Sequence, residues 1–307
     1  MADGVLVKGN FNIFLMNQQV AIGLDLGATR LKGVLLELDT GQILNYEMVE
    51  TKDADQWKAA VREMVEKLGG SKAYVGIGIA APGLTAENAR AITCMPGRME
   101  GLEGFDWQDF LGSTMKVIND AHAAITAEVN YGVAKNLKNV IMLTLGTGVG
   151  GGIWLNGKLH TGTIGRGGHM GHMSLDVNHP QRDITKIPGS LEDLIGDATV
   201  TYRSYGRYKD TRELVEAYRK QEPFATWVWL HSIRNLAAGV ASLINIFSPD
   251  MVVLGGGITS AEESLFKPLE TFLDLFEWRP MGGTVTIRKA HFAEWSGAVG
   301  AAAQFNV

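Results

Sequence analysis

Two adjacent polar residues, Asn119 and Asp120, directly follow a short apolar strand pattern at residues 116–118. A carboxylate at the end of a strand can remove a proton from a substrate hydroxyl, and a positioned base typically contributes about 10²–10⁴ in rate. A structural interpretation competes with this one, because Asn and Asp are also favoured N-cap residues and a helical pattern follows at residues 121–131. Residue types and spacing alone leave both interpretations open.

Two glycine turns could bind the phosphates that such a hydroxyl attacks. The stretch GTGVGGG at residues 146–152 follows a strong strand pattern, and a second turn at residues 27–29 lies between two apolar runs. Successive backbone N–H groups in such a turn can point into one concavity and bind anionic oxygens. We expect the turns at 27–29 and 146–148 to face each other across a cleft, although plain hairpin turns would have the same composition.

Two better-known nucleotide motifs are excluded. The pattern at residues 146–151 satisfies G-x-G-x-x-G, which marks a dinucleotide site only where it opens a helix. Here the sequence continues as IWLNGKL, and its Asn156-Gly157 pair predicts a hairpin. Residues 152–158 imitate a P-loop, but Leu159 stands where that motif needs Ser or Thr for Mg²⁺.

Four histidines crowd one segment: His160, His169, His172 and His179. The only cysteine, Cys94, excludes a multi-cysteine zinc site and an internal disulfide. We therefore expect one or two of these histidines to hydrogen-bond a polyol, and the others to lie at the surface. Zinc held by the histidines is the less favoured alternative, and no structural zinc is expected.

The elements that must position these residues alternate between strands and helices. The segment at residues 84–109 has no periodicity and predicts a loop over a cleft, and residues 160–198 show no clear periodicity either. We expect strands at residues 20–24, 33–38, 43–49, 73–81, 116–118, 139–145, 153–155, 251–254 and 284–289. We expect helices at residues 53–68, 121–131, 211–220, 224–246, 262–276 and 294–305.

A weak internal duplication indicates two similar α/β lobes with a cleft between them. Residues 25–34 can be aligned with residues 144–153, each as strand, glycine turn and returning strand. The strand-plus-glycine segments at 73–83 and 250–260 then recur later in each half. Such repeats are sought before a fold is assigned.

Composition limits the possible partners. The chain has 307 residues, 46% of them hydrophobic, and a net charge of −5, which gives no electrostatic footprint for nucleic acid. An apolar patch at residues 11–16 is too short for a membrane span, and polar residues interrupt the apolar tract at 227–247. Low cysteine content favours a reducing, cytoplasmic location.

Five segments together resemble the motifs of the ROK family of sugar kinases, within the actin-like ATPase superfamily. They are DLGATRLK at 25–32, GIAAPG at 78–83, VINDAH at 117–122, LGTGVGGG at 145–152 and VLGGGI at 253–258. The resemblance implies an α/β fold of two actin-like (ribonuclease H-like) lobes with an interlobe cleft. The N-terminal lobe would comprise residues 1–118, completed by a C-terminal helix at about 293–307, and the C-terminal lobe residues 119–292.

The resemblance also implies site residues, with Asp120 as the catalytic base. The sugar would be bound by Gly83, Asn119, His169, His172 and Glu192. ATP would be bound by Asp25, Gly27, Thr29, Arg30, Thr147, Gly148, Gly255, Gly256 and Gly257. Mg²⁺ would arrive with ATP, with Asp25 as a possible ligand.

Several positions depart from the family pattern. Ala28 replaces a glycine of the first turn, His122 replaces an asparagine, and His169 replaces a sugar-binding glutamate. The zinc segment has no cysteines, and only residues 189–192 match it. A carboxylate accepts hydrogen bonds from two neighbouring hydroxyls, whereas a neutral imidazole offers one donor and one acceptor. Glucose is therefore not assumed as the substrate.

The sequence thus predicts an ATP- and Mg²⁺-dependent kinase that phosphorylates a hydroxyl, expected to be a primary one, of a hexose or N-acetylhexosamine. Two alternatives remain: a sugar-responsive regulator and a non-catalytic sugar-binding protein. ROK repressors carry a DNA-binding segment ahead of the first turn, whereas about twenty residues precede it here, so no nucleic-acid partner is expected. No membrane partner is expected, and a homodimer is possible by analogy with ROK relatives.

Overall fold

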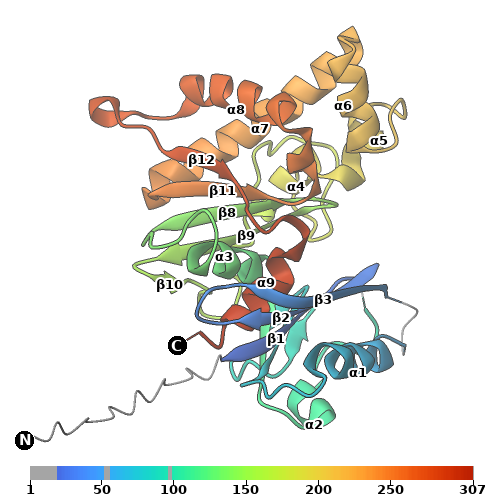
Figure 1. Ribbon diagram of the computed structural model, residues 1–307. Coiled ribbons are helices and arrows are strands. Elements are labelled where there is room, and N and C mark those ends of the chain that lie inside the picture. Colours follow the sequence, from blue (N-terminus) through green and yellow to red (C-terminus); the bar gives the residue numbers. More distant parts are fainter. Residues whose placement is uncertain (1–18, 52–55, 96–98, 307) are drawn as a thin grey trace, which may run out of the picture.

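Two five-stranded sheets, each covered by helices, form the two halves of the computed structural model, which describes residues 19–51, 56–95 and 99–306. Figure 1 shows the halves one above the other, with helices α3 and α9 where they meet. The apolar patch at 11–16 and the first residues of the helix expected at 53–68 lie outside the described residues.

The first sheet has the order β3-β2-β1-β4-β7. Its first three strands are antiparallel neighbours, and β4 and β7 run parallel to β1. Helix α1 (Gln56–Gly69) covers one face, because its buried stripe of Trp57, Val61, Met64 and Leu68 joins the core of β1 and β4. The strands are β1 (Val20–Leu26), β2 (Arg30–Glu37), β3 (Ile43–Glu50), β4 (Ile77–Ala81) and β7 (Met115–Asn119).

The second sheet repeats this plan in the order β10-β9-β8-β11-β12, again with three antiparallel strands followed by two parallel ones. The internal duplication is therefore confirmed: hairpin β1–β2 corresponds to β8–β9, and β4 to β11. The strands are β8 (Val140–Leu145), β9 (Val149–Leu155), β10 (Lys158–Leu159), β11 (Met251–Gly255) and β12 (Thr286–Lys289). Helices α6 (Thr211–Arg219), α7 (Pro223–Phe247) and α8 (Glu263–Phe276) cover this sheet.

Helices α3 (Asp120–Asn130) and α9 (Ser296–Ala303) pack against each other, α9 also against β1 and β4 and α3 against β9. Glycines make this close packing possible. A Cβ on Gly300 would lie 1.7 Å from Ala123 O, and a Cβ on Gly78 would lie 1.9 Å from Ala301 O. The expected division into lobes at residues 118 and 119 stays a prediction.

Short elements fill the segments between these helices and strands. They are β5 (Leu84–Thr85), β6 (Ile92–Cys94), α2 (Trp107–Leu111), α4 (Leu191–Ile195), α5 (Val200–Arg203) and the 3₁₀ turns Met170–His172, Asp197–Thr199, Gly257–Ala261, Pro280–Gly282 and Ala293–Trp295. The loop expected at 84–109 was therefore partly wrong, because it contains the β5–β6 hairpin and α2. The strand expected at 73–81 begins at Ile77.

The glycine turn expected at 146–152 was also partly wrong. Strand β9 begins at Val149, and Gly150, Gly151 and Gly152 pair with β8. These glycines serve close packing: a Cβ on Gly152 would lie 2.5 Å from the Ile125 side chain of α3. Only residues 146–148 form the turn.

Within the described part of the chain, no helix is long and apolar enough to cross a membrane.

Candidate active site

A cleft of about 1000 Å³ lies between the two halves. Its walls take Pro82, Gly83 and Cys94 from the first half and residues 146–151 from the second. Nine of the fifteen site residues expected from the sequence line it: Gly83, Asn119, Asp120, Thr147, Gly148, His169, His172, Glu192 and Gly256. The fold therefore gathers segments that are far apart in the sequence around one cavity.

Of the two neighbours Asn119 and Asp120, Asn119 takes the capping role. Asn119 is the N-cap of α3: its Oδ1 accepts hydrogen bonds from the N–H groups of Ala121 at 3.0 Å and His122 at 3.1 Å. Its Nδ2 donates to Gly83 O at 3.0 Å, which leaves one amide hydrogen for a ligand. Asp120, the first helical residue, is exposed to the cleft, and among the described residues its carboxylate accepts a hydrogen bond only from its neighbour Ala121 N.

Two hydrogen bonds stabilise the turn at residues 146–148. Gly146 N donates to Gly148 O at 2.9 Å, and Glu192 Oε2 accepts from Val149 N at 3.0 Å. A Cβ on Gly148 would lie 2.1 Å from Glu192 Oε2, so a side chain there would have to displace this carboxylate from Val149 N. Among the described residues the N–H groups of Thr147 and Gly148 have no hydrogen-bond partner, and both residues line the cleft. The turn is thus built to accept an anion.

Glu192 lies closer to this turn than its expected sugar-binding role suggested. One carboxylate oxygen is committed to Val149 N, which leaves Oε1 for a ligand. The residue still lines the cleft, so contact with a sugar stays a prediction.

The other glycine turn, at residues 27–29, does not line the cleft. Gly27 N donates to Arg30 O at 3.0 Å, and Thr29 and Arg30 are exposed. None of Asp25, Gly27, Thr29 and Arg30 lines the cleft. Of the three glycines after β11, Gly256, with φ +86°, lines the cleft, whereas Gly255 is buried in the strand and Gly257 is exposed.

Asp25 is nevertheless coupled electrostatically to the cleft. Burial raises the pKa of its carboxyl to about 6, and the charge of Asp120 adds to the rise while Lys32 opposes it. Lys32 Nζ lies 3.8 Å from Asp25 Oδ2, and about 21% of the Asp25 side chain is exposed. A cation bound beside Asp25 would oppose this rise, because a nearby positive charge favours the ionised carboxylate.

His169 and His172 line one side of the cleft, and the buried His122 lies beside His169. The rings of His122 and His169 lie 5.8 Å apart, and His172 lines the same wall. Burial lowers the pKa of both His122 and His169, so both rings are neutral at pH 7. His160 and His179 do not line the cleft.

Sequence reasoning missed several residues that line the cleft or contact its wall. Asp183 is buried and holds His172, with 2.9 Å between Oδ2 and Nδ1. Arg166 lines the cleft, and its guanidinium has no partner in the described part of the chain. An apolar surface comprises Met173, Ile184, Ile187, Leu243, Ile246 and Phe247. No periodic signal marked Asp183 or Arg166, because both lie in irregular segments.

No group of three or more His, Cys, Asp or Glu side chains among the described residues is arranged to hold a metal ion.

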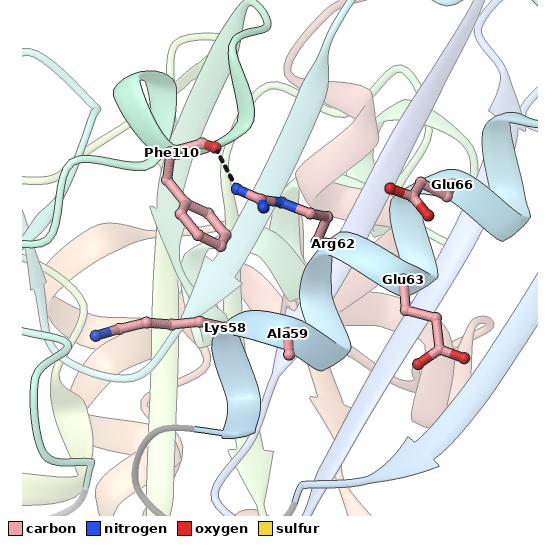
Figure 2. A pocket seen from close by; sticks show the side chains of 6 residues that line it. All are labelled: Lys58, Ala59, Arg62, Glu63, Glu66 and Phe110. Atoms are coloured by element: carbon pink, nitrogen blue, oxygen red, sulfur yellow. Dashed lines mark hydrogen bonds between the residues drawn. The ribbon is translucent and has the colours of Figure 1, made fainter.

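A second hollow, of about 400 Å³, lies on α1 and is shown in Figure 2. Arg62 Nη2 donates to Phe110 O at 3.1 Å, and its guanidinium lies 4.5 Å from the Phe110 ring centre. Glu63 points away from this pair, and no hydrogen bond or ion pair joins Glu66 to Arg62. Because its polar groups do not converge, we interpret this hollow as a solvated helix face.

Similar proteins match nearly the whole chain. The profile of the ROK family matches residues 21–306. A glucokinase from Thermotoga maritima is 30% identical over 308 residues, covering 92% of this chain and 95% of that enzyme. An N-acetylmannosamine kinase from Vibrio cholerae is 28% identical, covering 92% of this chain and 98% of that enzyme. The crystal structure of a ROK hexokinase from Thermus thermophilus has a TM-score of 0.78 at 28% identity, covering 93% of this chain and 97% of that one.

Proposed function

The chain belongs to the ROK family, and we infer that it is a sugar kinase that transfers the γ-phosphoryl group of ATP to a hydroxyl of a hexose or N-acetylhexosamine. One observation carries this inference. The exposed carboxylate of Asp120 and the unpartnered N–H groups of Thr147 and Gly148 line the same cleft. A base and an anion-binding turn in one cavity are the two parts that phosphoryl transfer to an alcohol requires.

In the proposed reaction, Asp120 accepts the proton of the sugar hydroxyl as that oxygen attacks the γ-phosphorus. The new O–P bond forms while the bond to the β-phosphate oxygen breaks, and ADP leaves. The turn at 146–148 stabilises the negative charge on the phosphates through its N–H groups. Closure of the two lobes, residues 1–118 with about 293–307 and residues 119–292, would exclude water during the transfer.

The remaining nucleotide contacts are assigned to the two turns and the glycines after β11. Asp25, Gly27, Thr29 and Arg30 would approach the phosphates when the lobes close, and residues 255–257 would lie against the nucleotide. Mg²⁺ prefers carboxylate and phosphate oxygens, and Asp25 fits it because burial and the charge of Asp120 leave its carboxyl with a pKa of about 6. When bound, the ion would neutralise charge on the phosphates.

Gly83, Asn119, His169, His172 and Glu192 would orient the sugar. The apolar surface of the cleft wall, which includes Met173 and Ile187, supports a substrate with an apolar substituent such as an acetyl methyl group. An N-acetylhexosamine offers hydroxyl groups to the polar residues and a methyl group to the apolar surface, whereas a plain hexose offers only the hydroxyl groups.

The test is Asp120→Asn, measured as ADP release from ATP with a panel of hexoses and N-acetylhexosamines. We expect wild-type activity on at least one sugar and a fall in kcat of about 10²–10⁴ in the variant. The melting temperature should change little, because Asn119 caps α3.

The matched control is Asp274→Asn, which makes the same change at an exposed aspartate on α8. It should retain wild-type kcat. Near-full activity of Asp120→Asn would refute the mechanism. A wild-type protein that binds ATP but phosphorylates no sugar of the panel would instead indicate a non-catalytic sugar-binding protein.

A further inference from the structure

Asp183 is a buried carboxylate with a full set of hydrogen bonds. Its side chain is 0% exposed. Oδ1 accepts from Thr185 N at 2.8 Å, Thr185 Oγ1 at 2.7 Å and Ile187 N at 3.0 Å. Oδ2 lies 2.9 Å from His172 Nδ1. The segment that contains Asp183 also lines the cleft through Thr185 and Ile187. The Asp183 carboxylate therefore connects His172 to this part of the cleft wall.

The chemistry of Asp183 determines which nitrogen of His172 carries the proton. Burial acts to raise the pKa of Asp183, but the hydrogen bonds from Ile187, Thr185 and His172 outweigh it and hold that pKa below its ordinary value. Asp183 is therefore ionised and can only accept hydrogen bonds. His172 Nδ1 must carry the hydrogen, and in the neutral ring Nε2 is an acceptor.

His169 reaches the same state by a different contact. Its Nδ1 lies 3.1 Å from Arg166 O, and a carbonyl oxygen can only accept. Nδ1 is thus the donor, and Nε2 is left with a lone pair. Nε2 of His169 and Nε2 of His172 have no partner among the described residues, and both residues line the cleft.

We propose that Asp183 and the carbonyl of Arg166 hold His172 and His169 in one tautomer, so that the sugar side of the cleft presents two Nε2 acceptors to two hydroxyl groups that donate. This proposal rests on the sugar-kinase function inferred above. Asp183 is a positioning residue: it acts on the sugar through His172. Together the two rings supply the pair of acceptors that a single carboxylate would otherwise offer.

The substitution Asp183→Asn tests this arrangement because it should reverse the tautomer. The three donors from Thr185 and Ile187 require an acceptor, so the amide oxygen of the new side chain stays with them. The amide nitrogen then faces His172 and donates to Nδ1, which leaves the hydrogen on Nε2. His172 would present a donor to the sugar where the wild type presents an acceptor.

The first measurement is ¹⁵N NMR of the histidine rings in the ligand-free protein. We expect protonated Nδ1 and unprotonated Nε2 for His172 in the wild type, and the reverse in Asp183→Asn. A wild type with hydrogen on Nε2 of His172 would overturn the proposal, and this result needs neither a folded variant nor any enzymatic activity.

The second measurement is the KM for the sugar and for ATP. We expect Asp183→Asn to raise the sugar KM by 10- to 100-fold and to leave the ATP KM within twofold of wild type. Asp176→Asn, an exposed aspartate in the same segment, should change neither. A reversed tautomer with an unchanged sugar KM would overturn the proposal.

Sugar analogues supply the third measurement. A deoxyfluoro sugar retains an acceptor but loses the donor, so replacement of the hydroxyl that His172 contacts should weaken wild-type binding at least tenfold. If the wild type shows no kinase activity, the function inferred above fails. The Kd of the sugar, measured by calorimetry in wild type and Asp183→Asn, then replaces KM and tests the acceptor pair separately. Equal Kd values for the sugar in wild type and Asp183→Asn would overturn the proposed acceptor pair.

Discussion

Neighbouring residues of similar chemistry acquire different roles through the backbone. Asn119 has the extended backbone of a cap residue, φ −61° and ψ 144°, which turns its side chain back onto the first N–H groups of α3. Asp120 is already helical, and its side chain lies outside the turn and in the cleft. The cap fixes the start of the helix, and the helix start fixes the place of the carboxylate. A capping amide and a carboxylate that lines the cleft are therefore parts of one unit.

Asp25→Asn should stabilise the protein at neutral pH. The folded-state pKa of Asp25 is about 6, above its ordinary value of 3.8, so ionisation of this residue opposes folding. The resulting loss of stability grows as pH rises from about 4 to about 6 and reaches at most about 3 kcal/mol, since each pKa unit is worth about 1.4 kcal/mol. We expect the variant to be about 1–3 kcal/mol more stable than wild type at pH 7.5 in urea unfolding.

The pH dependence separates this effect from a change in packing. At pH 3.5 most of the Asp25 carboxyl is protonated in both folded and unfolded protein, so the advantage of Asp25→Asn should largely disappear. The control Glu270→Gln, at an exposed carboxylate on α8, should show no such dependence. An equal gain at both pH values, or a variant less stable than wild type at pH 7.5, would contradict the assignment.

At the scale of elements, glycine determines how closely helices approach one another and the sheets. In β9 the glycines that follow the turn allow α3 to pack on the strand, and in α9 Gly300 allows contact with the α3 backbone. Helix α9 in turn lies beside Asp25: a Cβ on Gly297 would lie 2.6 Å from the Asp25 carboxyl carbon. Close packing therefore sets the distance between the first turn and the helix that carries Asp120.

The same substitution at two helical glycines should have opposite effects. Gly300→Ala places a methyl group 1.7 Å from Ala123 O, and because backbone must move, we expect a loss of about 3 kcal/mol or more. Gly239→Ala in α7 places it 3.5 Å from Leu191, an ordinary contact, so the higher helix propensity of alanine should add about 0.5–1 kcal/mol. Urea midpoints at constant m-value measure both. Changes of the same sign would show that helix propensity or general overpacking dominates at both sites.

At the scale of the whole molecule, two sheets of the same strand order place equivalent hairpin turns in two halves. The turn at 146–148 lines the cleft, and the turn at 27–29 lies beyond its wall. Under the proposed function, both turns must contact one nucleotide. The present arrangement is then the open state, and ligands should draw the halves together.

Sugar and nucleotide should each stabilise the protein and together make it more compact. A ligand at 100 times its Kd that binds only the folded state adds about 2.7 kcal/mol, so we expect the melting temperature to rise by several degrees. Small-angle scattering should show a smaller radius of gyration with a non-hydrolysable ATP analogue and sugar together. Asp120→Asn should respond in the same way, because the base is not needed for binding. An unchanged radius with both ligands bound would refute closure.

The sequence by itself determined the class of the protein. Strand, glycine turn and returning strand recur in each half, Asn119-Asp120 follows a strand, and the spacing of the glycine motifs is that of the ROK family. These signals are local, because period, turn chemistry and short motifs depend on residues close together in the chain. For the same reason the helix and strand positions were largely predictable, while the glycines of β9 were misread as a turn.

Only the tertiary structure decided which groups meet. The contact of Asp183 with His172 joins irregular segments with no periodic signal, and the apolar wall combines one of these segments with the end of α7. Which of Asn119 and Asp120 caps the helix depends on where α3 begins. Such contacts arise from packing between segments whose separation along the chain carries no information about their distance in space. Asp183, the residue that decides what His172 offers to a ligand, was therefore visible only in the fold.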